Sequence, residues 1–107
     1  MGAMASNKEY LDFILGQLSE VDGVSYRPMM GEYLLYVQGK LIGGIYDDRF
    51  LVKPTKSALE FLPEAEKESP YEGAKEMLLV DNLDNKQLLQ DLLQTMAKEL
   101  SPAKKKR

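Results

Sequence analysis

The sequence predicts a two-layer α+β domain: one five-stranded antiparallel sheet with helices packed on one face, in the order α-β-β-β-β-α-β-α. Two observations predict this fold. Residues 24–53 consist of short apolar runs separated by two-residue breaks at Met30-Gly31, Gln38-Gly39 and Asp47-Asp48, a pattern typical of a four-stranded meander. Apolar residues recur at helical spacing before and after the meander.

Length and composition indicate one domain with one core. The chain has 107 residues, of which 44% are hydrophobic. We assign residues 1–3 to a leader left by cloning, 4–101 to the domain and 102–107 to a disordered basic tail. No apolar run approaches the roughly 18 residues of a membrane span, and no signal-peptide pattern is present. The sequence therefore predicts a cytoplasmic protein without a membrane partner.

Histidine and cysteine are both absent from the chain. Zinc sites, Ser-His and Cys-His mechanisms depend on these residues, so such chemistry is excluded for the chain acting alone. We therefore predict no metal, no cofactor and no enzymatic activity. A mechanism based on a carboxylate, a lysine or a tyrosine stays open as an alternative.

The charge is unevenly distributed. The chain has 14 basic and 17 acidic residues, and four of the basic ones are the last four residues. Without them the balance is 10 against 17, so the domain carries a charge of −7. An acidic surface repels the phosphate backbone of duplex DNA, which argues against direct nucleic-acid contact. The basic tail is expected to be a solvated end.

The first helix is predicted to begin at the capping box Ser6-Asn7-Lys8-Glu9 and to end at Asp22-Gly23. Helical spacing gives it one apolar face, formed by Tyr10, Leu11, Phe13, Ile14, Leu18 and Val21.

The register of the meander follows if its breaks are two-residue turns. Gln38-Gly39 then pairs Leu35 with Ile42, and Asp47-Asp48 pairs Ile45 with Phe50. Alternation sorts the side chains onto two faces. The helix-covered face is predicted to hold Leu34, Tyr36, Leu41, Gly43, Ile45, Phe50 and Val52. The opposite, mixed face is predicted to hold Tyr33, Leu35, Val37, Lys40, Ile42, Gly44, Tyr46, Arg49, Leu51 and Lys53.

Three further elements are predicted after the meander. Thr55 caps a short helix that Pro63 ends, and residues 64–75 form an exposed polar loop. The apolar run 77–80 is the fifth strand. A final helix is predicted to start with a capping box at Asp84 and to end at Ser101-Pro102.

The mixed face is the candidate functional site, because apolar patches rimmed by charge are typical of interaction surfaces. The partner is expected to be another protein or a second copy of this chain. Three alternatives stay open: the loop 64–75 covers the face, the face holds single-stranded nucleic acid, or the chain binds or converts a small ligand. The predicted partner-binding residues are Arg27, Tyr33, Leu35, Lys40, Ile42, Tyr46, Arg49 and Lys53.

Two other motifs are interpreted as structural. Asp47-Asp48 is a carboxylate pair, but aspartate is also favoured in tight turns, and we interpret the pair as a turn. Gly43-Gly44 lacks the helix that follows a phosphate-binding loop, so we expect close packing of the backbone against a helix.

Three segments together resemble the TfoX amino-terminal domain family, which is related to the competence regulators TfoX and Sxy. They are Arg27–Tyr36, similar to the family's Arg-x-Met-Phe-Gly-Gly pattern, Asp47–Lys53, similar to its strand ending in lysine, and Tyr71–Met77. This chain has a single glycine in the first pattern, Met30-Gly31-Glu32. The resemblance implies an α+β fold and a transcriptional role, in which the domain is the protein partner of a DNA-bound activator of DNA-uptake genes.

Overall fold

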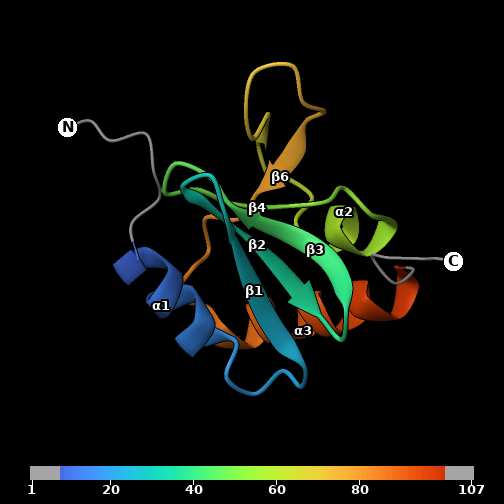
Figure 1. Cartoon of the computed structure of the whole chain (residues 1–107). Helices are drawn as coiled ribbons and strands as arrows, with labels where there is room; N and C mark the ends of the chain where they lie inside the picture. Colours follow the sequence, from blue (N-terminus) through green and yellow to red (C-terminus); the bar gives the residue numbers. More distant parts are fainter. Residues whose placement is uncertain (1–7, 101–107) are drawn as a thin grey trace, which may run out of the picture.

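The computed structural model describes residues 8–100, which form three helices and a six-stranded antiparallel sheet (Figure 1). The strands lie in the order β1-β2-β3-β4-β6-β5. The predicted α+β class is confirmed. The elements are α1 (Lys8–Gln17), β1 (Val24–Met29), β2 (Glu32–Val37), β3 (Lys40–Ile45), β4 (Phe50–Val52), α2 (Lys56–Phe61), β5 (Lys67–Glu68), β6 (Met77–Leu79) and α3 (Lys86–Glu99).

The sheet has one strand more than predicted. The additional strand, β5, consists of two residues in the segment that we expected to be a loop, and it pairs with Leu78 and Met77 of β6. Two charged residues carry no alternating apolar pattern, so this strand has no signal in the sequence. It forms because the backbone of residues 67–68 lies beside the free edge of β6 and pairs with it.

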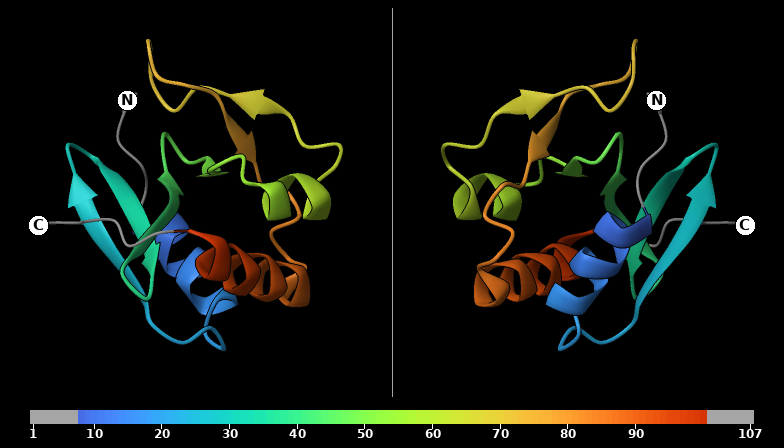
Figure 2. Two further views of the ribbon diagram at one scale, coloured as in Figure 1. Left: turned by 90° about the vertical axis from the view of Figure 1, so that its right-hand side faces the viewer. Right: turned by 90° about the vertical axis from the view of Figure 1, so that its left-hand side faces the viewer.

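All three helices lie on one side of the sheet, which curves around α1 and α3 (Figure 2). The core fills the space between the two layers. Helix α1 contributes Leu11 and Ile14 to it, and α3 contributes Leu89, Leu92, Leu93 and Met96. No helix of residues 8–100 lies on the opposite side of the sheet, which we call the outer face.

The three predicted hairpin breaks are confirmed as two-residue turns. Met30-Gly31, Gln38-Gly39 and Asp47-Asp48 all have positive φ, from 53° at Met30 to 87° at Gly31. Positive φ at both central residues defines the turn type whose twist matches that of the flanking strands. Each turn therefore lies at the residues predicted from the sequence and sets which residues begin and end the paired strands.

A β-bulge in the middle of the sheet changes the predicted register. Tyr36 pairs with Leu41 as expected, but Leu35 pairs with Gly43 instead of Ile42, so Ile42 is an extra residue in β3. Beyond the next turn, Ile45 pairs with Phe50 as predicted. One extra residue reverses the alternation of side chains on one side of the bulge only.

The predicted assignment of side chains to faces is therefore wrong for β2 and the start of β3. Leu35, Val37 and Ile42 lie in the core, with exposed fractions of 0%, 1% and 0%. The partly exposed residues Leu34, Tyr36 and Leu41, which we expected under the helices, lie on the outer face instead. Across the bulge the assignment is confirmed, since Ile45, Phe50 and Val52 are all fully buried.

Strand β1 is one of the two edge strands of the sheet, and most of its residues are exposed. Because Met29 and Glu32 flank a two-residue turn, they form a hydrogen-bonded pair, and the next pair, Pro28 with Tyr33, is not hydrogen-bonded. The missing N–H of Pro28 would therefore point away from β2. Proline costs no bond of the sheet here, and it hinders a further strand from adding to this edge.

The predictions for the first two helices are confirmed only in part. Ser6 of the first capping box lies outside the described residues. The apolar face of α1 is narrower than expected, because Phe13 is 47% exposed. Helix α2 is capped as predicted: the Thr55 hydroxyl accepts a hydrogen bond from the backbone N–H of Ala58 at 3.1 Å.

The cap of α3 lies one residue later than predicted. The side-chain oxygen of Asn85, not of Asp84, accepts a hydrogen bond from the Leu88 N–H at 3.1 Å. Replacing Asn85 by alanine should lower the free energy of unfolding by about 1 kcal/mol, because this N–H loses its partner. Asp84→Ala is the matched control and should have almost no effect. Chemical denaturation measures both, and an equal loss in Asp84→Ala would contradict the assignment of the cap.

Candidate interaction site on the outer face of the sheet

The outer face combines apolar side chains with cations. Its register follows from the strand pairing: Arg27 of β1 lies opposite Leu34, Tyr36 lies opposite Leu41, and Leu34 lies opposite Gly44. The side chains of Leu34, Tyr36 and Leu41 are partly exposed. Because the helices are all on the other side, these residues meet solvent or a partner.

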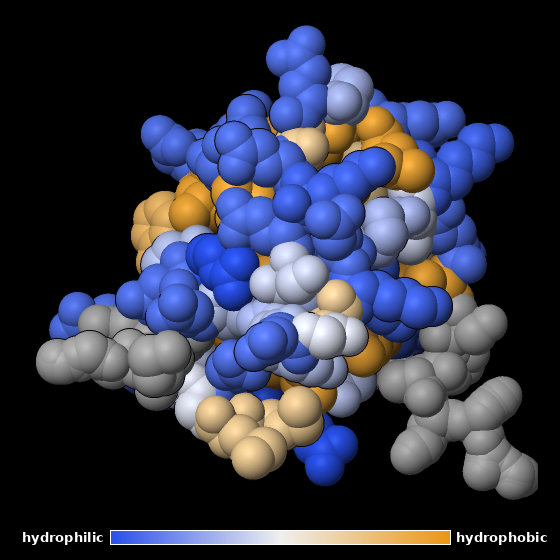
Figure 3. Space-filling model, turned by 90° about the horizontal axis from the view of Figure 1, so that it is seen from above, coloured by the Kyte–Doolittle hydropathy of each residue, from blue (hydrophilic) through white to orange (hydrophobic). Residues whose placement is uncertain are grey.

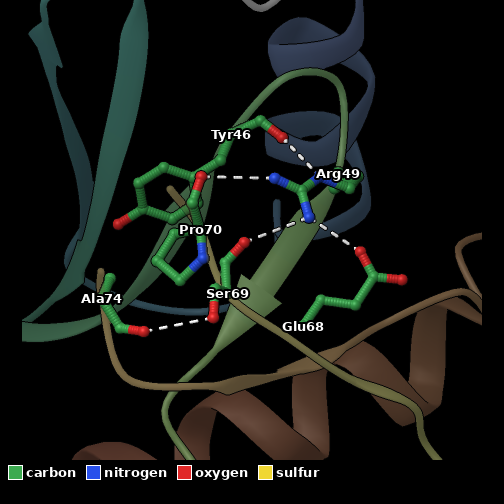
Figure 4. Close-up of polar contacts among 6 residues, drawn as sticks. All are labelled: Tyr46, Arg49, Glu68, Ser69, Pro70 and Ala74. Atoms are coloured by element: carbon green, nitrogen blue, oxygen red, sulfur yellow. Dashed lines mark hydrogen bonds and ion pairs between the residues drawn. The ribbon is translucent and has the colours of Figure 1, made fainter. Parts of the chain in front are cut away.

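Residues 69–76, which we call the roof loop, lie along one end of the outer face. Arg49 holds this loop in place (Figure 4). Its Nη1 donates to Glu68 Oε1 at 2.7 Å and to the Ser69 carbonyl at 3.3 Å, and its Nη2 donates to the Pro70 carbonyl at 3.2 Å. Its Nε donates to the Tyr46 carbonyl at 3.1 Å, which fixes the guanidinium on its own turn. The loop is therefore tied to the β3–β4 hairpin by one side chain.

The roof loop also has internal hydrogen bonds. The hydroxyl of Ser69 donates to the carbonyl of Ala74 at 3.1 Å, and the Ala74 N–H donates to the Tyr71 carbonyl at 3.1 Å. Pro70 is buried although the loop is on the surface. Together with the Arg49 contacts, these bonds give the roof loop a defined shape over the sheet.

Tyr46 lies between the sheet and the roof loop. Its ring passes so close to Gly44 that a Cβ atom there would lie 2.9 Å from the ring carbons. The ring meets Tyr71 of the loop edge to face, with centroids 6.5 Å apart. Burial is the main reason that the pKa of Tyr46 is raised above 10.0, and the charges of Glu32, Tyr71 and Tyr36 raise it further. The phenol is therefore protonated at neutral pH.

A hollow of about 390 Å³ opens between the outer face and the roof loop. Its walls are mainly apolar, with Lys53 and Lys75 as cations and Glu76 as the single acid. Seen from the side of the roof loop, the surface is mostly hydrophilic, and hydrophobic side chains form separate patches within it (Figure 3). The hollow is lined by Leu41, Gly43, Tyr46, Lys53, Pro54, Pro70, Tyr71, Ala74, Lys75, Glu76 and Met77.

Residues 8–100 contain no group of three or more histidine, cysteine, aspartate or glutamate side chains placed to hold a metal ion. Within the same residues, none of the three helices has the length and apolar character needed to cross a bilayer.

A model of the TfoX N-terminal domain matches residues 16–99, which is most of the chain. The chain belongs to the TfoX N-terminal domain family. It is also similar to a protein of Spirochaeta aurantia, "Uncharacterized 12.7 kDa protein in trpE 5'region", with 38% identity over 105 residues that cover 97% of this chain and 90% of the relative. No solved structure matches it. Membership of the family supports a regulatory type of module.

Half of the residues predicted to bind a partner lie on the helix side of this TfoX N-terminal domain. Leu35 and Ile42 are fully buried, so the prediction that they line an open face is wrong. Tyr33 packs against the core, and the ammonium of Lys40 donates to the Ala97 carbonyl of α3 at 2.7 Å. The bulge explains the position of all four residues, because the extra residue in β3 reverses which face of the sheet their side chains point to.

The other four predicted residues lie on the outer face. Arg27 is exposed at the edge of the face, Lys53 is partly exposed, and Tyr46 is buried under the roof loop. Arg49 is occupied by the loop, so its role is to position the loop. The alternative that the loop 64–75 covers the face is thus confirmed for the end beside β4 and β6. No segment of residues 8–100 covers the end beside β1 and β2.

Sequence reasoning missed the residues that form most of the hollow. Leu41 was assigned to the wrong face, and Pro70 and Met77 were given no role at the site. Tyr71 was not among the predicted binding residues either, although its ring lies on Tyr46. Gly43-Gly44 carried the one usable signal, since glycine inside a strand is typical of a bulge.

Replacing Arg49 by methionine should release the roof loop. The mutation removes the donors to the carbonyls of Ser69 and Pro70 and the ion-pair partner of Glu68, so we expect a loss of about 1 kcal/mol in global stability. We also expect about tenfold faster hydrogen exchange in the loop, because its local opening becomes easier. Exchange followed by NMR or mass spectrometry measures this effect.

Lys8→Met is the control for removing a cation. It breaks the 3.5 Å contact of Lys8 with Asp12, in which both side chains are 59% exposed. Such exposed pairs contribute less than about 0.5 kcal/mol, and this one is far from the loop. If loop exchange rises equally in both variants, Arg49 does not tether the loop.

Proposed function

We propose that this TfoX N-terminal domain is a non-catalytic regulatory module that binds a protein partner through the uncovered end of its outer face. The observation that carries the proposal is the pair of partly exposed apolar side chains Leu34 and Tyr36, which Leu41 extends to the border of the hollow, on a face that no helix of residues 8–100 covers. Surfaces with an apolar centre and a polar rim are typical of protein interfaces.

Charge indicates the character of the partner. Arg27 and Lys53 lie on this face, and within residues 8–100 neither forms an ion pair. They stand out in a domain that carries a charge of −7 when the four terminal basic residues are left out. A partner with apolar and acidic side chains would complement the face. In its narrowest form, the proposal follows the family resemblance: the partner is a DNA-bound activator, and the genes are those of competence.

Two observations support a function without catalysis. The chain has no histidine and no cysteine, the residues most often used for proton transfer and nucleophilic attack at neutral pH. Tyr46, the buried tyrosine at the hollow, has a raised pKa, so it is a poor base at neutral pH.

Direct binding of nucleic acid is the weaker alternative. It would use the basic tail and the cations Lys40, Arg49 and Lys53. Lys40 donates a hydrogen bond to the Ala97 carbonyl, and Arg49 donates hydrogen bonds to the roof loop. Arg27 and Lys53 remain on the face, and two cations on a domain with a charge of −7 give little counterion release. Binding of a single-stranded oligonucleotide that weakens steeply with salt would revive this alternative.

Site-specific photocrosslinking tests the proposal. A p-benzoylphenylalanine in place of Tyr36 should give an adduct of defined mass with one protein in cells of the source organism. The same group in place of Phe13, an exposed aromatic residue on α1, is the control and should not give that adduct.

The captured protein must then bind the purified domain directly. We expect Leu34→Asp to weaken this binding at least tenfold, because it places a charge in the apolar centre of the face. An adduct with a second copy would identify the face as a homodimer contact. The proposal fails if positions 36 and 13 give the same adducts, or if Leu34→Asp binds as the wild type does.

A further inference from the structure

The hollow beneath the roof loop has the properties of a small-molecule site. Its volume of about 390 Å³ lies within the range of ligand pockets, and its walls are largely apolar. Leu41 and Met77 come from the sheet, while Pro70 and Tyr71 come from the loop. The sheet and the roof loop therefore both line the hollow, which is open to solvent.

The hollow is formed before any ligand arrives. The guanidinium of Arg49 connects the β3–β4 hairpin to the roof loop, because it donates hydrogen bonds to the Tyr46 carbonyl of the hairpin and to the Pro70 carbonyl of the loop. Ser69 closes the loop on itself through Ala74. A preformed site loses little conformational entropy on binding, which favours affinity for a small ligand.

The charges at the rim indicate an anionic ligand. Lys53 and Lys75 oppose the single acid Glu76, so the lining carries a charge of +1 within an acidic domain. The hollow of about 400 Å³ between α2 and the start of α3 differs in this respect: it is lined by Glu64, Glu66 and Asp81 and by no cation.

The same charges favour a carboxylate over a phosphate. Phosphate groups are typically held by arginine forks or by helix N-termini, which supply several donors at once. The guanidinium of Arg49 is already occupied by Glu68 and by the carbonyls of Tyr46, Ser69 and Pro70. Two lysine side chains remain, and they suit a group with one negative charge.

We propose that this hollow binds a small apolar monocarboxylate. The apolar part lies against Tyr71, Leu41 and Met77, and the carboxylate faces the ammonium of Lys53. The hollow lies at the covered end of the outer face, and it shares only Leu41 and Lys53 with the surface proposed for the protein partner. A ligand here would contact the roof loop and the sheet together and would therefore hold the loop more firmly.

An NMR titration with 2-naphthoate tests the proposal on the ¹⁵N-labelled chain. We expect saturable shifts of the backbone amides of Tyr46, Lys53, Tyr71 and Met77. Neutral 2-naphthamide has nearly the same shape, and we expect it to bind at least fivefold more weakly because it lacks the charge.

Two variants separate a defined site from general hydrophobic binding. Lys53→Gln should abolish the preference for naphthoate over naphthamide, while Lys67→Gln, which removes a cation outside the hollow, should keep it. The proposal is overturned if shifts do not saturate, if they centre on other residues, or if the acid and the amide bind equally to the wild type. The crosslinking test uses Tyr36 and Leu34, which do not line the hollow, so the two proposals fail separately.

Discussion

Phe50→Ala should lower the free energy of unfolding by about 3–5 kcal/mol, the range for loss of a fully buried aromatic side chain. Phe50 has no exposed surface and is the largest fully buried side chain of the core. It lies opposite Ile45 in the hairpin whose register the sequence predicted. Truncation removes apolar contact and leaves a cavity that the surrounding helices and strands can fill only in part.

Chemical denaturation is the measurement, read as a shift of the midpoint at unchanged slope. Phe13→Ala makes the same chemical change on α1, where the side chain is 47% exposed, and it should cost less than about 1 kcal/mol. Similar losses in the two variants would mean that Phe50 is not at the centre of the core.

Gly43→Ala should destabilise the domain by about 3 kcal/mol, the upper end of the usual effect of overpacking. A Cβ atom at Gly43 would overlap the carbonyl oxygen of Leu51 and would lie 2.7 Å from the Cα of Val52. Both obstacles are backbone atoms of β4, which cannot move aside without breaking the pairing of β3 with β4. The neighbour that requires glycine is therefore an adjacent strand, and our expectation of a packed helix is wrong.

Gly16→Ala is the matched control for the loss of a glycine. Gly16 lies within α1, and a Cβ atom there meets nothing within 4 Å. Alanine should raise stability by about 0.5–1 kcal/mol, because glycine is unfavourable inside a helix. Thermal or chemical unfolding should therefore shift in opposite directions for the two variants. A tolerated Gly43→Ala would show that the bulge can relax.

The candidate site shows where prediction from the sequence stops. Lys53 and Tyr46 were assigned to the correct face because their hairpin has a regular two-residue turn and no bulge. Leu35 and Ile42 were assigned to the wrong face by a single residue of register. The hollow itself was not predictable, since the roof loop reaches Tyr46 only through long-range contacts of Arg49 and Tyr71.

The sequence by itself determined the α+β class, the four strands of the meander, their turns and the family. These features depend on local chemistry: the periodicity of apolar residues, the tolerance of Gly and Asp for positive φ, and caps such as Thr55. The tertiary structure decided the bulge at Ile42, the pairing of β5 with β6 and the position of the roof loop. The pairing of β5 with β6 and the position of the roof loop depend on contacts between residues distant in the chain, and the bulge depends on how the two faces of the sheet pack. The periodicity of a short stretch of sequence shows neither.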